Sequence, residues 1–241
     1  VRIFDAVMGA LSLAAPDRVM AGLSHWSNPN ISGIERQSGS NFIFYDLVMG
    51  GTGARPIKDG IEAMSAPFNA ANIPVEVQEA NTPLLVERIE LIPDSGGAGK
   101  YRGGLGLRKD VRVFGDQLRL VNLTDRCVHA PFGLFGGEKG KPGRTLVIRG
   151  ESGTPVHSKS TTRLAESDVI SFQVSGGGGY GAAIERDVEG VRQDVIKGYV
   201  SVEGAAEAYG VVIDPTTTTV DQSATAVRRA AMAGVATSSS I

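Results

Sequence analysis

The chain opens on hydrophobic positions that are spaced like one face of an α-helix. They are Phe4, Val7, Met8 and Leu11. Side chains three and four positions apart stack on one side of a helix. Pro16 ends or interrupts this pattern, because proline lacks the N–H that a helix interior needs. The sequence therefore predicts an N-terminal helix that stops before Pro16.

The C-terminal end also shows helical spacing, and a polar capping residue precedes each segment. Asp187, Ser201 and Asp221 can each accept a hydrogen bond from the first turn of a helix. Gly210 suits the position just past the end of the second helix, and the last helix is expected to run through Val227. We expect residues 214–241 to be partly a flexible tail, since residues 237–241 are small and polar.

Between the two ends, runs of β-branched and aromatic residues predict strands. The runs cover residues 41–48, 74–77, 84–91, 107–114, 118–123, 145–149 and 168–174. Residues 115–117 are expected to form a hairpin turn, and the polar residues 24–41 an ordered loop. The predicted fold class is α+β: a β-rich central region with mixed sheets and Gly-rich turns, helices at both ends, and a single unit over residues 1–241.

Glycine is concentrated in clusters that separate these segments. The chain has 32 glycines, with clusters at residues 50–53, 96–99, 103–106, 136–137 and 176–179. Such clusters indicate backbone with positive φ or backbone that closely approaches another group. Residues 103–106 and 176–179 could also direct N–H groups at an anion. Neither cluster has the Gly-Lys-Ser/Thr of a P-loop, so tight packing and anion binding both remain open.

Composition narrows the class of protein. The formal net charge is -2 with both signs interspersed, so no basic surface for nucleic acid or anionic lipid is expected. No apolar run reaches the length of a membrane span, and no signal peptide is apparent. Cys127 is the only cysteine, which excludes an internal disulfide and suits a small core residue. A cytoplasmic location is expected.

The sequence offers little support for a metal site in this chain. His25, His129 and His157 are far apart and lack metal-ligand spacing. We therefore assign no metal ligand, and each histidine is expected to lie in a surface or hydrogen-bonded loop. His25 is the best candidate for a functional histidine, because Trp26 and Asn30 give it aromatic and polar neighbours.

Several blocks occur in an order that resembles the hydantoinase B/oxoprolinase family. The blocks are residues 50–56, 59–60, 72–76, 83–88, 94–106, 175–181, 185–187, 198–201 and 209–212. The resemblance covers most of the chain, from about Val1 to Val227. Thr52 stands where family members usually carry an aromatic residue, and Ala182-Ala183 stand where they usually carry Asp-Pro. The part of the family subunit that finds no counterpart here is its N-terminal half.

The resemblance implies one component of a two-part, cytoplasmic, hetero-oligomeric hydrolase. A hydantoinase A-type subunit would bind ATP and Mg and phosphorylate a substrate oxygen. The B-type part would then complete the hydrolysis of a small cyclic amide, of the hydantoin, 5-oxoproline or lactam type. A divalent metal is expected in the N-terminal half, whose chain would be a second partner, and no cofactor is expected on this chain alone. The alternatives are a component of an acetone- or acetophenone-type ketone carboxylase, and a structural or assembly chain of such a complex.

The most family-like blocks also supply the candidate site residues. Arg55, Asn69 and Asn72 are the catalytic candidates, because they can donate hydrogen bonds to a substrate and Arg55 can hold an anion with its planar fork of donors. The candidates for a substrate or phosphate loop are Gly50, Gly51, Gly53, Arg102, Gly103 and Gly104. A structural alternative is that charged residues in the β-rich part, Arg102 among them, form buried ion pairs.

Overall fold

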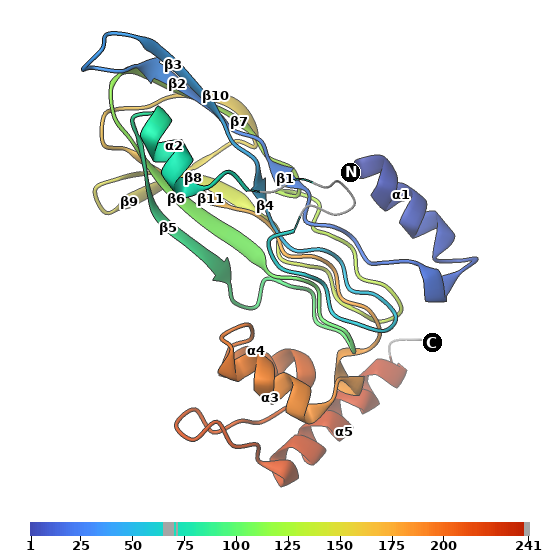
Figure 1. Cartoon of the computed structure of the whole chain (residues 1–241). Helices are drawn as coiled ribbons and strands as arrows, with labels where there is room; N and C mark the ends of the chain where they lie inside the picture. The colour runs from blue at the N-terminus through green and yellow to red at the C-terminus, as the bar shows by residue number, and fades with distance from the viewer. Residues whose placement is uncertain (65–69, 71, 239–241) are drawn as a thin grey trace.

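The computed structural model describes residues 1–64, 70 and 72–238 of the chain. Two larger antiparallel sheets lie at one end of the molecule, a bundle of extended loops continues from them, and helices lie beside and below the bundle (Figure 1). The predicted α+β class, with helices at the N-terminal start and the C-terminal end, is confirmed. No helix among the described residues has the length and apolar character needed to cross a membrane.

The strands form one sheet of four, one of five and a small pair. The four-stranded sheet has the order β10-β7-β2-β3, the five-stranded sheet β5-β6-β11-β8-β9, and β1 pairs with β4. The bounds are β1 Trp26–Ser27, β2 Asn30–Ile34, β3 Asn41–Tyr45, β4 Val48–Met49, β5 Leu84–Ile92, β6 Gly106–Val113, β7 Asp116–Leu123, β8 Arg144–Arg149, β9 Ser152–Val156, β10 Lys159–Arg163 and β11 Val169–Gln173. All pairs between these strands are antiparallel, where the sequence analysis expected mixed sheets.

The two larger sheets enclose one hydrophobic core. Ile31 of β2, Leu120 of β7, Val111 of β6 and Phe172 of β11 are all buried in it, so both sheets contribute to the same cluster. Along β7, buried residues alternate with exposed ones, as expected for a strand with one face against a core. The predicted strands that became β3, β5, β6, β7, β8 and β11 are confirmed.

Three local predictions were wrong. Residues 24–41 hold β1 and β2 rather than only a loop, because β2 pairs with both β3 and β7 despite its polar composition. Residues 75–81 form the helix α2, Val75–Asn81, rather than a strand at 74–77; its buried Gln78 accepts a 2.8 Å hydrogen bond from Lys109. The turn at 115–117 does not close a hairpin, since β6 and β7 belong to different sheets. Gly115, with φ of +117°, turns the chain from one sheet to the other.

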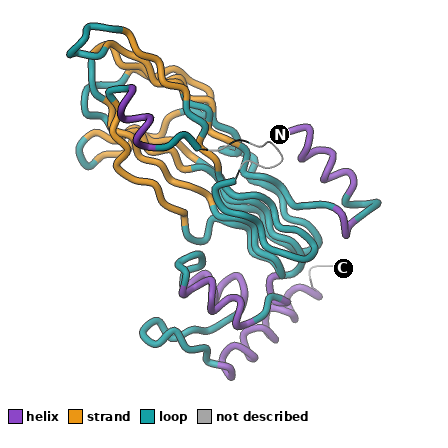
Figure 2. Tube along the Cα trace, in the orientation of Figure 1, coloured by secondary structure: helices purple, strands orange, loops and turns teal. Residues whose placement is uncertain are grey.

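Most of the glycine clusters lie in extended segments that run side by side (Figure 2), and Gly136, in a turn with a φ of +89°, is the exception. A Cβ on Gly51 would come within 3.0 Å of the backbone of Gly104, and one on Gly103 within 3.0 Å of the backbone of Gly177. None of these four glycines has a positive φ. Hydrogen bonds join the segments, from Gly104 N to Thr52 O at 2.9 Å and from Gly177 N to Gly104 O at 2.8 Å. Close approach of backbones therefore explains these clusters.

The C-terminal helices lie at the end of the bundle opposite the sheets (Figure 1). They are α3 Val188–Ile196, α4 Val202–Tyr209 and α5 Gln222–Ser238, preceded by the 3-10 turn η2 Ala183–Glu185. The predicted caps are confirmed: Asp187 accepts from Gly190 N, and Ser201 accepts from Gly204 N. Asp221 accepts from Ala224 N at the start of α5, which extends past Val227 to Ser238. A second hydrophobic core holds α3 and α4 against the bundle.

Candidate functional site

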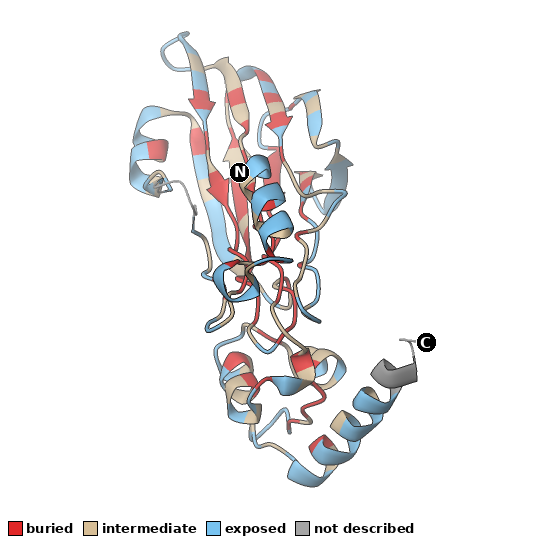
Figure 3. Cartoon of the chain, turned by 90° about the vertical axis from the view of Figure 1, so that its right-hand side faces the viewer, coloured by how far each residue is buried: buried red, intermediate tan, exposed pale blue. Residues whose placement is uncertain are grey.

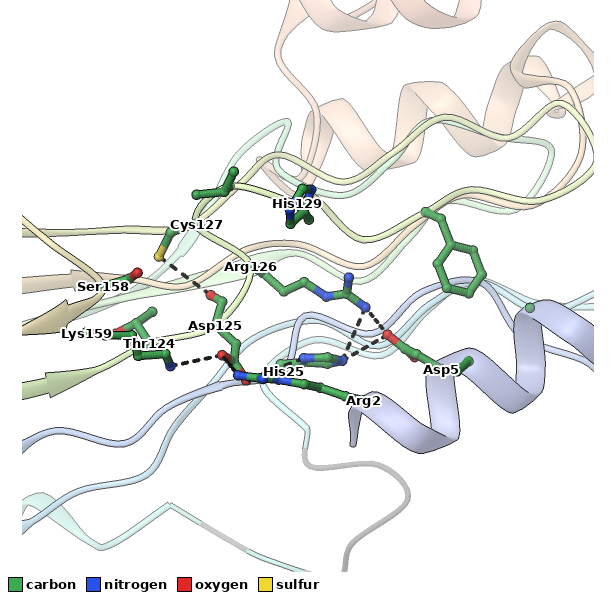
Figure 4. Close-up of a pocket in the computed structure, with 14 residues that line it drawn as sticks. Arg2, Asp5, His25, Thr124, Asp125, Arg126, Cys127, His129, Ser158 and Lys159 are labelled. Carbon is green, nitrogen blue, oxygen red and sulfur yellow. Dashed lines mark hydrogen bonds and ion pairs between the residues drawn. The ribbon is translucent and has the colours of Figure 1, made fainter.

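A pocket of about 600 Å³ lies between α1 (Arg2–Leu11) and the loop that follows β7. Its charged and reactive lining residues are Arg2, Asp5, His25, Asp125, Arg126, Cys127, His129 and Lys159. Figure 4 shows Asp5 reaching from α1 toward His25, with Arg126 beside both of them. Residues from four separate parts of the sequence thus meet in one pocket.

His25 is the centre of this cluster. Its Nε2 lies 2.9 Å from Asp5 Oδ2 and 3.2 Å from Arg126 Nη2, while its Nδ1 lies 3.7 Å from Asp125 Oδ2. Arg126 also donates to Asp5 and, through Nε, to the carbonyl oxygen of Leu23 at 3.0 Å. His25 and Asp5 are both buried. The arrangement fixes the imidazole from two sides and leaves it little freedom to rotate.

Two residues of the cluster have unusual backbone conformations. His25 and Arg126 both have a φ of 61°, in the left-handed region that residues with a Cβ seldom occupy. Such conformations cost about 1–3 kcal/mol each and occur often at functional sites. The surrounding contacts therefore hold both side chains in the pocket at the expense of local stability, which favours a role beyond packing.

The outer part of the pocket is an ion cluster around Asp125. Arg2 and Lys159 both donate to this carboxylate, Lys159 at 3.0 Å. Burial alone would raise the pKa of Asp125, but the hydrogen bonds and charges of Arg2 and Lys159 hold it below its ordinary value. Cys127 is half-buried next to Asp125, and burial raises the pKa of its thiol. Cys127 therefore stays protonated at neutral pH and is a poor nucleophile.

We expect His25 to remain neutral well below the usual pH for histidine. Burial lowers its pKa to about 4, against the attraction of Asp125. The unfolded chain would take up this proton at about pH 6.5, so His25 favours the folded state fully above that pH. Its contribution is lost as the pH falls toward 4. Titration of the His25 ring by NMR should give a midpoint near 4, and a midpoint near 6.5 would contradict the buried placement.

A second polar cluster joins the bundle to the C-terminal helices. Arg186 donates to Asp59 at 2.7 Å through each of two nitrogens, and to Asp194 of α3 at 2.7 Å. Arg102 donates to Glu62 at 2.9 Å, and its Nε lies 3.5 Å from Asp194. Burial alone would raise the pKa of Asp59, but hydrogen bonds from Arg186 and from the N–H of Arg102 hold it below its ordinary value. Arg102 is thus part of a buried ion network.

The predicted site residues do not all come together. Arg55 forms an isolated bridge with Lys58 through its backbone; within the described part of the chain its guanidinium makes no ion pair, and its buried Nε has no hydrogen-bond partner. Asn72 is exposed, and Asn69 lies outside the described residues.

Gly50, Gly51, Gly53, Gly103 and Gly104 all lie in the bundle. The N–H groups of Gly103 and Gly104 already donate to backbone carbonyls, so neither is directed at an open site. The phosphate-loop role of this group remains a prediction.

Residues 1–64, 70 and 72–238 contain no cluster of side chains that could bind a metal ion. Nowhere in these ranges do three His, Cys, Asp or Glu side chains gather in a way that could hold an ion. Asp5, Asp125 and Arg126 were not singled out from the sequence, because only the tertiary fold brings them to His25. His25 itself was the histidine that its local neighbours favoured.

Residues 1–183 match the family model described as hydantoinase B/oxoprolinase. The chain belongs to the hydantoinase B/oxoprolinase family. The family match ends at Ala183, so the helices α3, α4 and α5 lie outside it, whereas the resemblance in the sequence extended to about Val227.

Relatives extend the similarity along most of the chain. It is 35% identical over 240 residues to the beta chain of the caprolactamase of Pseudomonas jessenii, a match that covers 94% of this chain and 41% of the relative. It is 34% identical over 217 residues to the B-type chain of the "Putative D-/L-hydantoinase" of Pseudomonas sp. strain NS671, a match that covers 88% of this chain and 36% of the relative. The chain therefore spans about two fifths of the length of these relatives.

Solved structures show the same fold. The ATP-dependent caprolactamase from Pseudomonas jessenii aligns with a TM-score of 0.81 and 30% identity, covering 92% of this chain and 40% of that chain. Acetone carboxylase, in a nucleotide-free structure, aligns with a TM-score of 0.84 and 20% identity, covering 99% and 37%. At 20% identity the second likeness concerns the fold alone. The fold thus occurs both in an ATP-dependent caprolactamase and in acetone carboxylase, so the fold alone leaves the reaction open.

Proposed function

We propose that this chain is part of the B-type subunit of an ATP-dependent enzyme that hydrolyses small cyclic amides. The observation that carries the proposal is its sequence identity, along nearly its full length, to a caprolactamase chain. The hydantoinase-named relative supports the same substrate class. Acetone carboxylase supports only the fold, so the ketone carboxylase and the purely structural chain are the lesser alternatives.

The proposed reaction divides the work between two kinds of subunit. An A-type partner, with ATP and Mg, phosphorylates the amide oxygen, which turns a poor electrophile into a reactive one. The B-type part then holds this intermediate away from bulk water. One bound water adds to the amide carbon, the ring nitrogen leaves with a proton, and a second water releases phosphate from the resulting acyl phosphate. A divalent metal, if the whole enzyme uses one, would be held by the part of the B-type subunit that this chain does not include.

Within this chain, two features suit the binding of such an intermediate. The pocket at His25 places the donors Arg126, Arg2 and Lys159 around a cavity large enough for a small ring. Arg55 offers a guanidinium whose buried Nε has no hydrogen-bond partner within the part of the chain that the structure describes. An arginine fork binds phosphate or carboxylate oxygens in pairs, which positions as well as attracts an anion.

Substrate-dependent ATP hydrolysis tests the reaction. The complex that contains this chain and its A-type partner is incubated with ATP and with a hydantoin, 5-oxoproline or a lactam, and phosphate release and ring opening are measured together. Ketone with bicarbonate is the comparison. We expect a cyclic amide to stimulate both signals in parallel, and stimulation by the ketone and bicarbonate alone would exclude the hydrolase.

Replacing Arg55 with alanine tests its part in that reaction. A charge-assisted hydrogen bond contributes about 1.5–3 kcal/mol, so the Arg55→Ala complex should turn over about 10- to 100-fold more slowly while assembling normally. Arg55→Lys should recover part of the rate, because it keeps the charge but not the fork. Arg119→Ala, on the exposed side of β7, is the matched control. Unchanged turnover in Arg55→Ala would point to a structural role for this residue.

A further inference from the structure

The N-terminal helix α1 packs with an apolar side facing solvent, away from the rest of the structure. The side chains of α1 and its C-cap that the body buries are polar: Asp5 and Ser12 are 5% and 8% exposed. On the other side, Ile3, Val7 and Leu11 are 81%, 45% and 43% exposed. These three lie four positions apart along the helix and so form one continuous stripe. A surface helix ordinarily turns such a stripe inward.

The contacts of α1 explain this orientation. Its inward side is tied by ion pairs and polar contacts, since Asp5 binds His25 and Arg126, and Arg2 binds Asp125. Figure 1 shows α1 standing beside the sheets and bundle, and in Figure 3 its outer side is largely exposed. Leu13, just past the helix and 92% exposed, prolongs the apolar side.

We propose that the stripe of Ile3, Val7 and Leu11 is the surface on which the remaining part of the B-type subunit packs. The inference rests on one part of the proposed function, namely that this chain is a portion of a B-type subunit. The chain covers only 36–41% of the length of the relatives named above. Most of such a subunit therefore has to pack against this structure.

The chemistry of the stripe favours this occupant over a separate subunit. An interface inside one obligate unit resembles a hydrophobic core cut in half, whereas contacts between separable proteins are more polar. Ile3, Val7 and Leu11 are all aliphatic, and the exposed Ala6 and Ala10 lie beside them. Docking there would place α1 between the rest of the subunit and the pocket. The same helix would then transmit the position of that part to Asp5 and His25.

Photo-cross-linking in the assembled complex tests the proposal. A diazirine amino acid replaces Leu11 in the complex purified with all its subunits, and mass spectrometry identifies the cross-linked peptide. A second variant carries the same group at Ile43 of β3, which is 76% exposed and lies on no proposed interface. We expect Leu11 to cross-link to the remaining part of the B-type subunit, at least about tenfold more than Ile43 does.

Each other outcome overturns the inference. A cross-link from Leu11 to a second copy of this chain or to the A-type subunit assigns the stripe to another partner, and no cross-link above the Ile43 level means that it stays exposed. Leu11→Asp adds a check, since a fully exposed position would tolerate the charge without loss of assembly. None of these measurements needs catalysis, so a complex that fails to hydrolyse cyclic amides leaves this inference standing, and the reverse also holds.

Discussion

Replacing Gly177 with alanine is expected to cost the protein most of its stability. A Cβ at this position would lie within 3.0 Å of the backbone of Thr52 and Gly53, in the middle of the bundle. Backbone atoms held by hydrogen bonds on both sides cannot move aside as a flexible side chain would. Overpacking a core typically costs about 1–3 kcal/mol, and the collision with main chain places Gly177→Ala at or above the upper end, about 3 kcal/mol or more.

Urea unfolding followed by circular dichroism measures this effect. The matched control is Gly234→Ala on α5, where an added Cβ meets no atom of the described residues within 4 Å. Alanine is a better helix former than glycine by up to about 1 kcal/mol, so this variant should be unchanged or slightly more stable. Gly177→Ala should unfold at a lower urea concentration or be recovered unfolded. Similar midpoints for the two variants would mean that the glycine segments are not closely packed.

Replacing Asp194 with asparagine is expected to be the most damaging change among the charged residues. Asp194 is 6% exposed and faces both Arg186 and Arg102, so the neutral amide leaves two buried guanidinium groups short of a counter-charge. Removing one partner of a buried ion pair costs about 3–5 kcal/mol. The loss should fall on the junction between the bundle and α3, because Asp59 and Arg102 belong to the bundle and Asp194 to the helix.

Thermal unfolding compares this variant with a matched surface change. Asp116→Asn removes a carboxylate that pairs with Arg36, at a position where both side chains are more than half exposed. Exposed pairs contribute little, so the melting temperature of Asp116→Asn should stay close to that of the unmodified protein while that of Asp194→Asn falls by several degrees. Equal melting temperatures would show that the network is not needed to hold the helices.

Elements that depend on local chemistry were predictable. The caps Asp187 and Ser201 were identified because a capping side chain and its helix are adjacent in sequence. The strand β2 was missed because its polar composition gives no local signal, and two neighbouring strands hold it in place. The helix α2 was missed because two valines at alternate positions favour a strand, while burial of Gln78 favours the helix.

The candidate site was predictable only in part. His25 was singled out from its immediate neighbours, but Asp5 and Arg126, which hold it, lie 20 and 101 positions away. For Arg102 the sequence left the ion-pair alternative open, and its partners Glu62 and Asp194 emerge only from the fold. The glycine clusters likewise allowed both close backbone packing and anion binding. The packing of one cluster against another joins segments far apart in the sequence, so the sequence alone could not choose between the two.

Intact-mass spectrometry of the native complex tests the central claim most directly. The complex is purified through a tag on this chain, and every polypeptide in it is weighed. We predict the B-type part in full, as one longer polypeptide or as two chains, together with an A-type subunit that binds ATP. Recovery of this 241-residue chain alone, folded and monodisperse, would contradict its assignment as part of an ATP-dependent amide hydrolase.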